Sequence, residues 1–250
     1  MTPRGTTVRG KDSTRSASSA NGSEFSRYDK DAVSFLVELS VNNDRDWFKA
    51  NQERYERSVR EPTLALIRAM RPRLARFSKH LVASDQKVGG SMMRPQRDTR
   101  FSANKLPYKT NVGVQFRHVS GKDVHAPGVY FHFDPESVFL GVGLWHPEPP
   151  ILAKLRTHIA KHPKQWQSVL GAPEFRRRFE PHGESLTRAP KGFAPDHPQI
   201  ELLKRKDHIV LTRVPHALLF KAGLPDLLQQ RMMIARDYMR LLHRALELPF

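Results

Sequence analysis

One stretch of the sequence, residues 94–111, carries most of the side chains that could do chemistry. It contains five cations and one carboxylate: Arg94, Arg97, Arg100, Lys105 and Lys109, with Asp98 among them. Arginine presents a planar fork of N–H donors that matches phosphate or carboxylate oxygens, and lysine adds a compact positive charge. Two like unit charges 4 Å apart repel by roughly 4 kcal/mol at an effective dielectric constant of 20. A converged cluster therefore needs an anion, and the segment predicts a site for a phosphate-bearing or other anionic small ligand.

Two further groups of residues could complete such a site. Around residues 129–133, apolar side chains alternate with Tyr130 and His132, so a strand here turns a phenol and an imidazole together to one side. Histidine is the side chain best suited to moving protons near neutral pH. The second group lies in a loop rich in proline and glycine, where Arg188 could form one wall of a pocket.

These residues divide into two candidate roles. We expect the anion to be held by a cationic set with one phenol: Arg94, Arg97, Arg100, Lys105, Lys109, Tyr130 and Arg188. Catalytic proton transfer is expected from Asp98, His132 and Tyr108, the aspartate acting either as a base or as a partner that orients an arginine. Such a set suits phosphoryl or nucleotidyl chemistry, in which positioning and charge stabilisation dominate. Whether the protein is an enzyme stays open at this point.

Two other functions fit the same residues. The chain has 42 Lys and Arg against 25 Asp and Glu, a formal net charge of +17, and Phe101, Tyr108 and Trp145 accompany the cations. That combination suits a nucleic-acid-binding module. Alternatively, the cations form internal salt bridges to the acidic residues within 134–148, and the protein is a non-catalytic interaction protein. An anionic small molecule is the preferred partner, nucleic acid is the second candidate, and the oligomeric state stays open.

Composition and missing motifs narrow the class of protein. The chain has no cysteine, which excludes disulfides, thiolate metal sites and a cysteine nucleophile. The sequence has no Gly-rich phosphate loop, dinucleotide-binding fingerprint or zinc-binding His-Glu-x-x-His motif, so we expect no cofactor and no metal. No apolar run approaches about 18 residues, and the N-terminus lacks the apolar stretch of a secretory signal. We therefore expect no membrane partner and a cytoplasmic location.

The apolar pattern predicts the elements that position these residues. A period of three to four residues indicates helices over 29–41, 45–60, 62–80, 151–162, 164–170, 173–179, 199–205 and 225–246. Alternation of apolar residues indicates strands near 112–116, 129–133 and 138–142, and a further strand is expected at 208–214. Short turns between the first three strands favour an antiparallel meander. We expect an α+β fold: a central, mostly antiparallel sheet flanked by helices, with an N-terminal helical segment and a long C-terminal helix.

The domain organisation follows from the same pattern. Residues 1–28 have too few apolar side chains to order themselves, so a disordered tail is predicted there. Residues 29–250 show no linker and are expected to form a single α+β domain.

The central motif also resembles a known family. Its signature here is Arg94-x-x-Arg97-Asp98-x-Arg100-Phe101, followed by Asn104-Lys105 and Tyr108-Lys109. Further stretches that agree are Asp46-Trp47-Phe48, Ala126-Pro127-Gly128-Val129-Tyr130, Gly141-Val142-Gly143-Leu144-Trp145 and Leu186-Thr187-Arg188-Ala189-Pro190. Together they are similar to the domain of unknown function 2461 family over roughly residues 32–245. The resemblance implies no reaction, substrate or cofactor, so the site must be argued from its chemistry.

Overall fold

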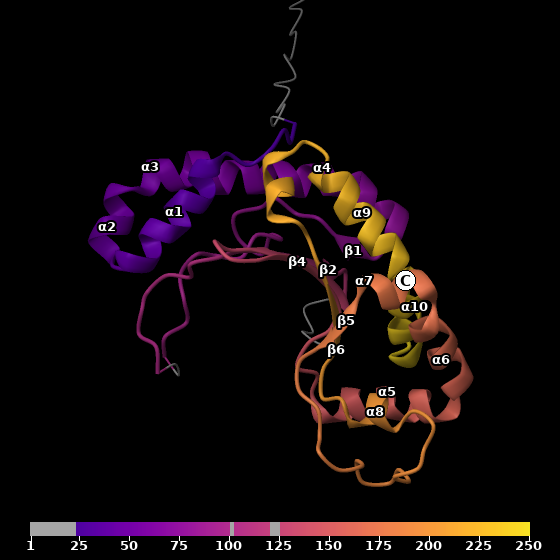
Figure 1. The fold of residues 1–250 in the computed structure, drawn as a ribbon. Helices are drawn as coiled ribbons and strands as arrows, with labels where there is room; N and C mark the ends of the chain where they lie inside the picture. Colours follow the sequence, from indigo (N-terminus) through magenta and orange to yellow (C-terminus); the bar gives the residue numbers. More distant parts are fainter. Residues whose placement is uncertain (1–23, 101–102, 121–125) are drawn as a thin grey trace, which may run out of the picture.

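A six-stranded antiparallel sheet forms the centre of the molecule (Figure 1). The computed structural model describes residues 24–100, 103–120 and 126–250. The strands are β1 (Leu81–Val82), β2 (Val112–His118), β3 (Gly128–Phe133), β4 (Val138–Leu144), β5 (Glu180–His182) and β6 (His208–Arg213). Their order is β1-β2-β3-β4-β6-β5, and every neighbouring pair is antiparallel. The predicted meander is confirmed as β2–β3–β4, and the predicted α+β class is confirmed with it.

Helices occupy most of the remaining chain. Before the meander lie α1 (Lys30–Val41), α2 (Arg45–Ala50), α3 (Gln52–Tyr55), the π-helical turn η1 (Glu56–Arg60) and α4 (Glu61–Phe77). After it lie α5 (Pro149–Lys161), α6 (Pro163–Gly171), α7 (Pro173–Arg178), α8 (Ile200–Lys204), the 3-10 turn η2 (His216–Phe220), α9 (Leu224–Ile234) and α10 (Arg236–Ala245). Asp44 caps the start of α2, because its carboxylate accepts hydrogen bonds from the N–H groups of Asp46 and Trp47.

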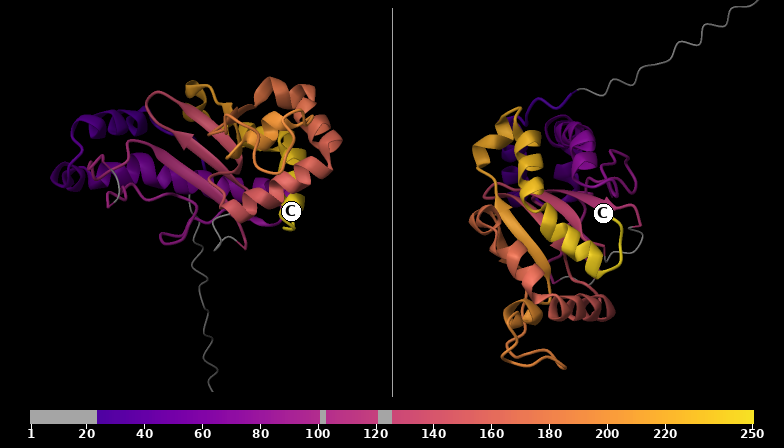
Figure 2. Two further views of the ribbon diagram at one scale, coloured as in Figure 1. Left: turned by 90° about the horizontal axis from the view of Figure 1, so that it is seen from below. Right: turned by 90° about the vertical axis from the view of Figure 1, so that its right-hand side faces the viewer.

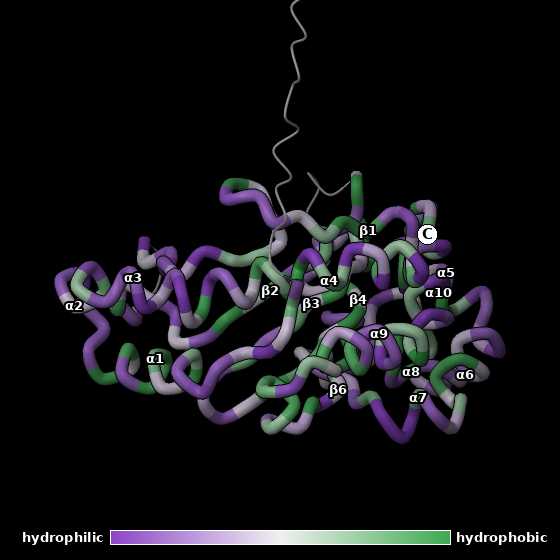
Figure 3. The backbone as a smooth tube through the Cα atoms, turned by 90° about the horizontal axis from the view of Figure 1, so that it is seen from above, coloured by the Kyte–Doolittle hydropathy of each residue, from purple (hydrophilic) through white to green (hydrophobic). Residues whose placement is uncertain are grey.

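The two faces of the sheet differ in what they contact. On β3, Val129, Phe131 and Phe133 are fully buried, whereas Tyr130 and His132 between them are only partly covered. Helices α4, α9 and α10 gather over the buried face (Figures 1 and 2), with α9 and α10 both against β4. The hydropathy colouring in Figure 3 shows apolar segments in β3 and β4 at the centre of the molecule. The face with Tyr130 and His132 is called the open face below.

The predicted helices differ from the observed ones at two places. The helix expected over 45–60 is interrupted at Asn51, and its second part then runs on as α3, η1 and α4. Pro62 lacks an N–H, and the helix widens just before it, so that the Glu61 N–H bonds to the Glu56 carbonyl five residues back. The long C-terminal helix is two helices with a break at Ala235. The break lets α9 pack on α4 while α10 packs on α5 and α6.

The start of the chain adds to the core. Residues 1–23 of the predicted tail lie outside the described residues, but Phe25 and Tyr28, which were assigned to the same tail, are buried. The Tyr28 hydroxyl donates to Thr63 Oγ1 at 3.0 Å, and the Tyr28 N–H donates to the Leu219 carbonyl at 3.0 Å. Within the described part of the chain, no helix is both long and apolar enough to cross a bilayer.

Candidate functional site

The predicted cationic segment forms a two-sided arm that leaves the sheet just before β2. We call residues 94–100 and 103–109 the basic arm. Its two sides are joined by hydrogen bonds from the Arg97 N–H to the Pro107 carbonyl and from the Lys109 N–H to the Pro95 carbonyl, both at 2.8 Å. In Figure 1 the arm extends from the sheet on the side of α1, α2 and α3. Its base therefore lies beside these helices, and its tip projects away from the sheet.

The arm is anchored through Tyr108 rather than through its charges. The Asn43 side chain forms two hydrogen bonds with the backbone of Tyr108: its Nδ2 donates to the Tyr108 carbonyl at 3.1 Å, and its Oδ1 accepts from the Tyr108 N–H at 2.9 Å. The Tyr108 ring is buried and stacks on Phe48, with ring centroids 4.1 Å apart and planes at 10°. The structure thus places this predicted catalytic phenol in the aromatic core, apart from the other candidates.

At the tip of the arm the charges bond locally. The Asp98 carboxylate accepts from Arg100 Nη2 at 2.7 Å and from Arg100 Nε at 3.0 Å. These bonds lower the pKa of Asp98 to about 2. Lys105 Nζ donates to the Thr99 carbonyl at 3.0 Å. Asp98, Arg100 and Lys105 are all exposed, and none of them borders the cavity described next.

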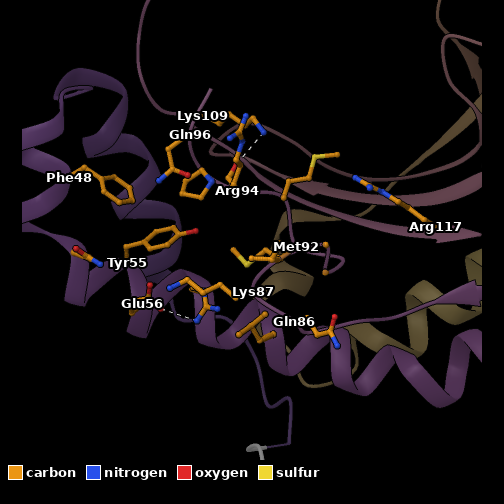
Figure 4. Close-up of a pocket in the computed structure, with 18 residues that line it drawn as sticks. Phe48, Tyr55, Glu56, Gln86, Lys87, Met92, Arg94, Gln96, Lys109 and Arg117 are labelled. Carbon is orange, nitrogen blue, oxygen red and sulfur yellow. Dashed lines mark hydrogen bonds and ion pairs between the residues drawn. The ribbon is translucent and has the colours of Figure 1, made fainter. Parts of the chain in front are cut away.

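Arg94 and Lys109, at the base of the arm, border a cavity of about 830 Å³ (Figure 4). Lys109 Nζ donates to the Arg94 carbonyl at 3.2 Å. Partial burial lowers the pKa of Lys109, and the nearby charges of Arg94 and Arg97 lower it further. Arg97 itself turns elsewhere: its Nε is buried and meets no hydrogen-bond acceptor among the residues that the structure describes.

The other walls of the cavity come from α2, α3, η1, the start of α4 and the turn at residues 86–90. The lining side chains that bear charge are Arg60, Lys87, Arg94, Lys109 and Arg117, with Glu56 as the single carboxylate. Arg60 Nη1 lies 3.1 Å from Glu56 Oε2, so that pair is neutral as a unit. Figure 4 shows the Tyr55 ring and Met92 facing one another across the space, below Arg94. The cavity thus has four positive charges in excess of its one ion pair.

A second group of residues lies on the open face of the sheet. His132 Nε2 is 2.9 Å from Asp134 Oδ2, and His132 Nδ1 is 3.1 Å from the Tyr130 hydroxyl oxygen. The imidazole stacks on Phe139 of β4, with ring centroids 4.5 Å apart. The structure therefore brings the predicted residues Tyr130 and His132 into contact and adds a carboxylate to them.

Asp134 is held by several donors. Besides His132, its carboxylate accepts from the N–H groups of Glu136 and Ser137 at 2.8 and 2.7 Å and from the Ser137 hydroxyl at 3.0 Å. Burial acts to raise its pKa, but these hydrogen bonds outweigh burial and lower it. Burial and the Asp134 charge raise the pKa of Tyr130. At neutral pH the group therefore contains an ionised carboxylate and a protonated phenol.

The open face adjoins the cavity through Met93 and Gly113. A Cβ atom built on Gly113 would lie 2.7 Å from the Tyr130 hydroxyl oxygen and 3.1 Å from Met93 Sδ, so both side chains rest over this glycine. Met93 also lines the cavity. Its N–H donates to the Gly113 carbonyl at 2.9 Å, which holds residue 93 against the edge of β2. Tyr130 is thus separated from the cavity by the Met93 side chain.

The remaining predicted residues lie apart from the arm. Arg188 is exposed in the loop between β5 and α8, which Figure 1 shows at the opposite end of the molecule from the arm. Trp145, proposed as a stacking partner for bases, is also distant from the arm in sequence and packs on His182 of β5, with ring centroids 5.8 Å apart. Phe101 lies outside the described residues. Of the two aromatic candidates that the structure describes, Tyr108 therefore stacks on Phe48 and Trp145 packs on His182.

Sequence reasoning missed four residues: Arg60, Lys87 and Arg117 of the cavity wall, and Asp134 on the open face. Asp134 carried a signal, because it is two residues beyond His132 and so falls on the same side of an extended chain. Because Pro135 and Glu136 follow it, the sequence indicates instead that Asp134 is a turn residue. Asp134 also has that role, because its carboxylate accepts a hydrogen bond from the Glu136 N–H. No comparable signal marks Arg60 or Lys87, which reach the cavity only through the packing of η1 and the turn at 86–90.

Within residues 24–100, 103–120 and 126–250, no group of three or more histidine, aspartate or glutamate side chains is placed to hold a metal ion.

Comparisons with curated proteins and with solved structures give no match. A family described as "Conserved hypothetical protein (DUF2461)" matches residues 31–240, which include the basic arm, the cavity and the open face. The chain therefore belongs to the DUF2461 family.

Proposed function

We propose that this protein binds an anionic small ligand, phosphate-bearing or carboxylate, in the cavity at the base of the basic arm. The observation that carries the proposal is the charge of the lining: five cationic side chains and one carboxylate surround the same space. Like charges gathered around a partly desolvated space repel one another, and a bound anion removes that repulsion. The pKa of Lys109 is lowered mainly by burial, and the charges of Arg94 and Arg97 lower it further, as such repulsion does.

The size and the donors of the cavity support a small ligand. Its volume of about 830 Å³ falls within the range of roughly 300–1,000 Å³ that is usual for small-molecule sites. Arg94 and Arg117 offer planar guanidinium forks, and Lys87 and Lys109 offer point charges, which together suit several oxygens on one anion. Tyr55 and Phe48 supply an apolar wall for the uncharged part of such a ligand.

Phosphoryl or nucleotidyl chemistry at this site requires a group that moves protons. Of the three predicted catalytic residues, Asp98 is paired with Arg100 and Tyr108 is stacked in the core. His132 is the candidate whose surroundings suit the task, because it lies between a carboxylate and a phenol next to the Met93 wall of the cavity. We therefore propose His132 as the acid–base group of any such reaction.

A thermal-shift series tests the binding proposal. The purified full chain is heated with inorganic phosphate, pyrophosphate, ATP and citrate, at constant ionic strength. We expect at least one of these anions to raise the melting temperature, since a ligand at a hundredfold excess over its Kd adds about 2.7 kcal/mol to the free energy of unfolding. We expect the double variant R94A/K109A to lose most of this shift.

The matched control is R188A/K191A, which removes two cations from the distant loop between β5 and α8. It should respond to the anion as the wild type does. The proposal is contradicted if the anion raises the melting temperature equally in both double variants, or if none of the four anions raises the melting temperature of the wild type. A single-stranded oligonucleotide that binds more tightly than these anions, with a steep loss of affinity in salt, would favour the nucleic-acid module instead.

A further inference from the structure

Three side chains from β3 and the turn after it form a continuous hydrogen-bonded row. The row runs from Asp134 Oδ2 to His132 Nε2 at 2.9 Å, and from His132 Nδ1 to the Tyr130 hydroxyl at 3.1 Å. Stacking on Phe139 fixes the plane of the imidazole between its two partners. The carboxylate is in turn fixed by Ser137. Phe139 therefore fixes the orientation of His132, and Ser137 fixes the orientation of Asp134.

The positions of the protons in this row follow from the donors and acceptors. An ionised carboxylate only accepts hydrogen bonds, so His132 Nε2 carries the proton that points to Asp134. In the neutral form of the ring the lone pair is then on Nδ1. Asn111 Nδ2, which only donates, lies 3.4 Å from this nitrogen and is consistent with that form. In that form the Tyr130 hydroxyl donates its proton to His132 Nδ1.

We infer that Tyr130 is a base-activated phenol, the terminal acid–base group of a Tyr130–His132–Asp134 relay on the open face, with the Met93 side chain between it and the cavity. When a group bound on the open face gives a proton to the Tyr130 oxygen, the phenol proton passes to His132 Nδ1, so that group loses one proton and the imidazole gains one. Asp134 is a positioning residue, because its charge stabilises the imidazolium from the nitrogen that faces away from Tyr130.

Tyr130 differs from the other tyrosines of the chain. The sequence has five, and Tyr28, Tyr55, Tyr108 and Tyr238 are all buried, whereas Tyr130 is partly exposed. The Tyr28 hydroxyl donates to a threonine and the Tyr238 hydroxyl donates to the His208 carbonyl, neither of which is a base. A reagent that selects phenols with a neighbouring base should therefore select Tyr130.

Methanesulfonyl fluoride provides that test without any knowledge of the ligand. The Tyr130 oxygen bonds to sulfur, the S–F bond breaks, fluoride leaves, and the phenol proton goes to His132 Nδ1. Labelling of the full chain is followed by peptide mass spectrometry at each of the five tyrosines. In the wild type we expect Tyr130 to be labelled faster than the other four tyrosines. In His132→Gln we expect the labelling rate of Tyr130 to fall at least tenfold, since a positioned base contributes about that factor or more.

Two further variants separate base activation from packing. Asp134→Asn should also slow the labelling, because the imidazolium loses its counter-charge. In His132→Ala, added imidazole should restore part of the rate, which a merely structural loss would not allow. Gln115→Ala is the matched control, because Gln115 lies directly opposite Tyr130 on β2 and accepts its hydrogen bond from Arg117. Its labelling rate should equal that of the wild type.

The inference is overturned if Tyr130 of the wild type is not labelled, or if folded His132→Gln and Asp134→Asn are labelled at the wild-type rate. It is also overturned if Gln115→Ala slows the reaction as much as His132→Gln does. The anion-binding proposal can be contradicted independently of this inference. If the protein binds none of the four anions but Tyr130 is labelled as expected, the proposed function is wrong and the inference about Tyr130 still holds.

Discussion

At its base, the basic arm lines the cavity with Arg94 and Lys109, whereas at its tip Asp98 bonds to Arg100, and Asp98, Arg100 and Lys105 do not border the cavity. The side chains are of the same types and lie within the same 16 residues, 94–109. Both lysines bond to a carbonyl of the arm itself, but their surroundings differ: Lys109 is partly buried, whereas Lys105 is exposed to water, as are Arg94, Asp98 and Arg100.

The difference between the two regions lies in the partial burial of Lys109 rather than in the number of charges. Water screens the exposed charges at the tip, and each of them finds a local acceptor at little energetic cost. At the base, partial burial lowers the pKa of Lys109, and the charges of the exposed Arg94 and of Arg97 lower it further. The predictions that follow vary one region while the other serves as its control.

The largest effect is expected from the anchor at the base. Asn43→Ala leaves the buried N–H and carbonyl of Tyr108 without their partner, and each such loss costs about 1–3 kcal/mol. We expect the free energy of unfolding, measured in urea, to fall by about 2 kcal/mol or more. The matched change at the tip is Asn104→Ala, because Asn104 Oδ1 accepts from the exposed Leu106 N–H at 3.0 Å. It should cost less than about 0.5 kcal/mol. Equal losses at both sites would show that the arm has no preferred anchor.

An intermediate effect is expected from pH, through Lys109. Its pKa is lowered by burial and by Arg94 and Arg97, so the folded protein loses this charge below the value of about 10.4 that is usual for lysine. Anion affinity should therefore fall, by about tenfold, as the pH rises through that lowered pKa. Over the same interval the unfolded chain binds more protons than the folded one, so the free energy of unfolding of the ligand-free protein should rise with pH.

Lys109→Arg is the control for this titration, because arginine keeps its charge throughout the interval. Its anion affinity, measured by calorimetry from pH 7 upwards, should stay level where that of the wild type falls. A fall of equal size in Lys109→Arg would show that another group is responsible.

How far the sequence predicts the fold depends on how regularly each element buries one side. The alternation is clearest in β3, where Val129, Phe131 and Phe133 are buried and the residues between them are only partly covered. The register pairs Val114 with Phe131 and Phe131 with Leu140, as a meander of β2, β3 and β4 requires. β1 and β5 have two and three residues, too few for any alternation to be seen. The break at Ala235 has no glycine or proline to mark it, because it results from what α9 and α10 pack against.

The same limit applies to the candidate site. Sequence places Tyr130 and His132 on one face because the period of a strand is two residues, and the structure brings them into contact. No such period exists in the basic arm, so spacing along the chain does not show which cations turn inward. Arg94 and Lys109 border the cavity, whereas Arg100 does not. This difference depends on the contacts of Asn43 and Phe48 with Tyr108, and both residues are more than 40 residues earlier in the sequence.

The smallest effect is expected at the tip. Lys105→Ala removes an exposed charge that bonds to the arm's own backbone and does not border the cavity, so anion affinity measured by calorimetry should change by less than about twofold at physiological salt. Asp98→Asn breaks an exposed ion pair and should shift the melting temperature by less than about 2 °C. A tenfold loss of affinity in Lys105→Ala would mean that the arm folds over its bound ligand, so that tip and base act on the same anion. The two regions would then differ only in the ligand-free protein.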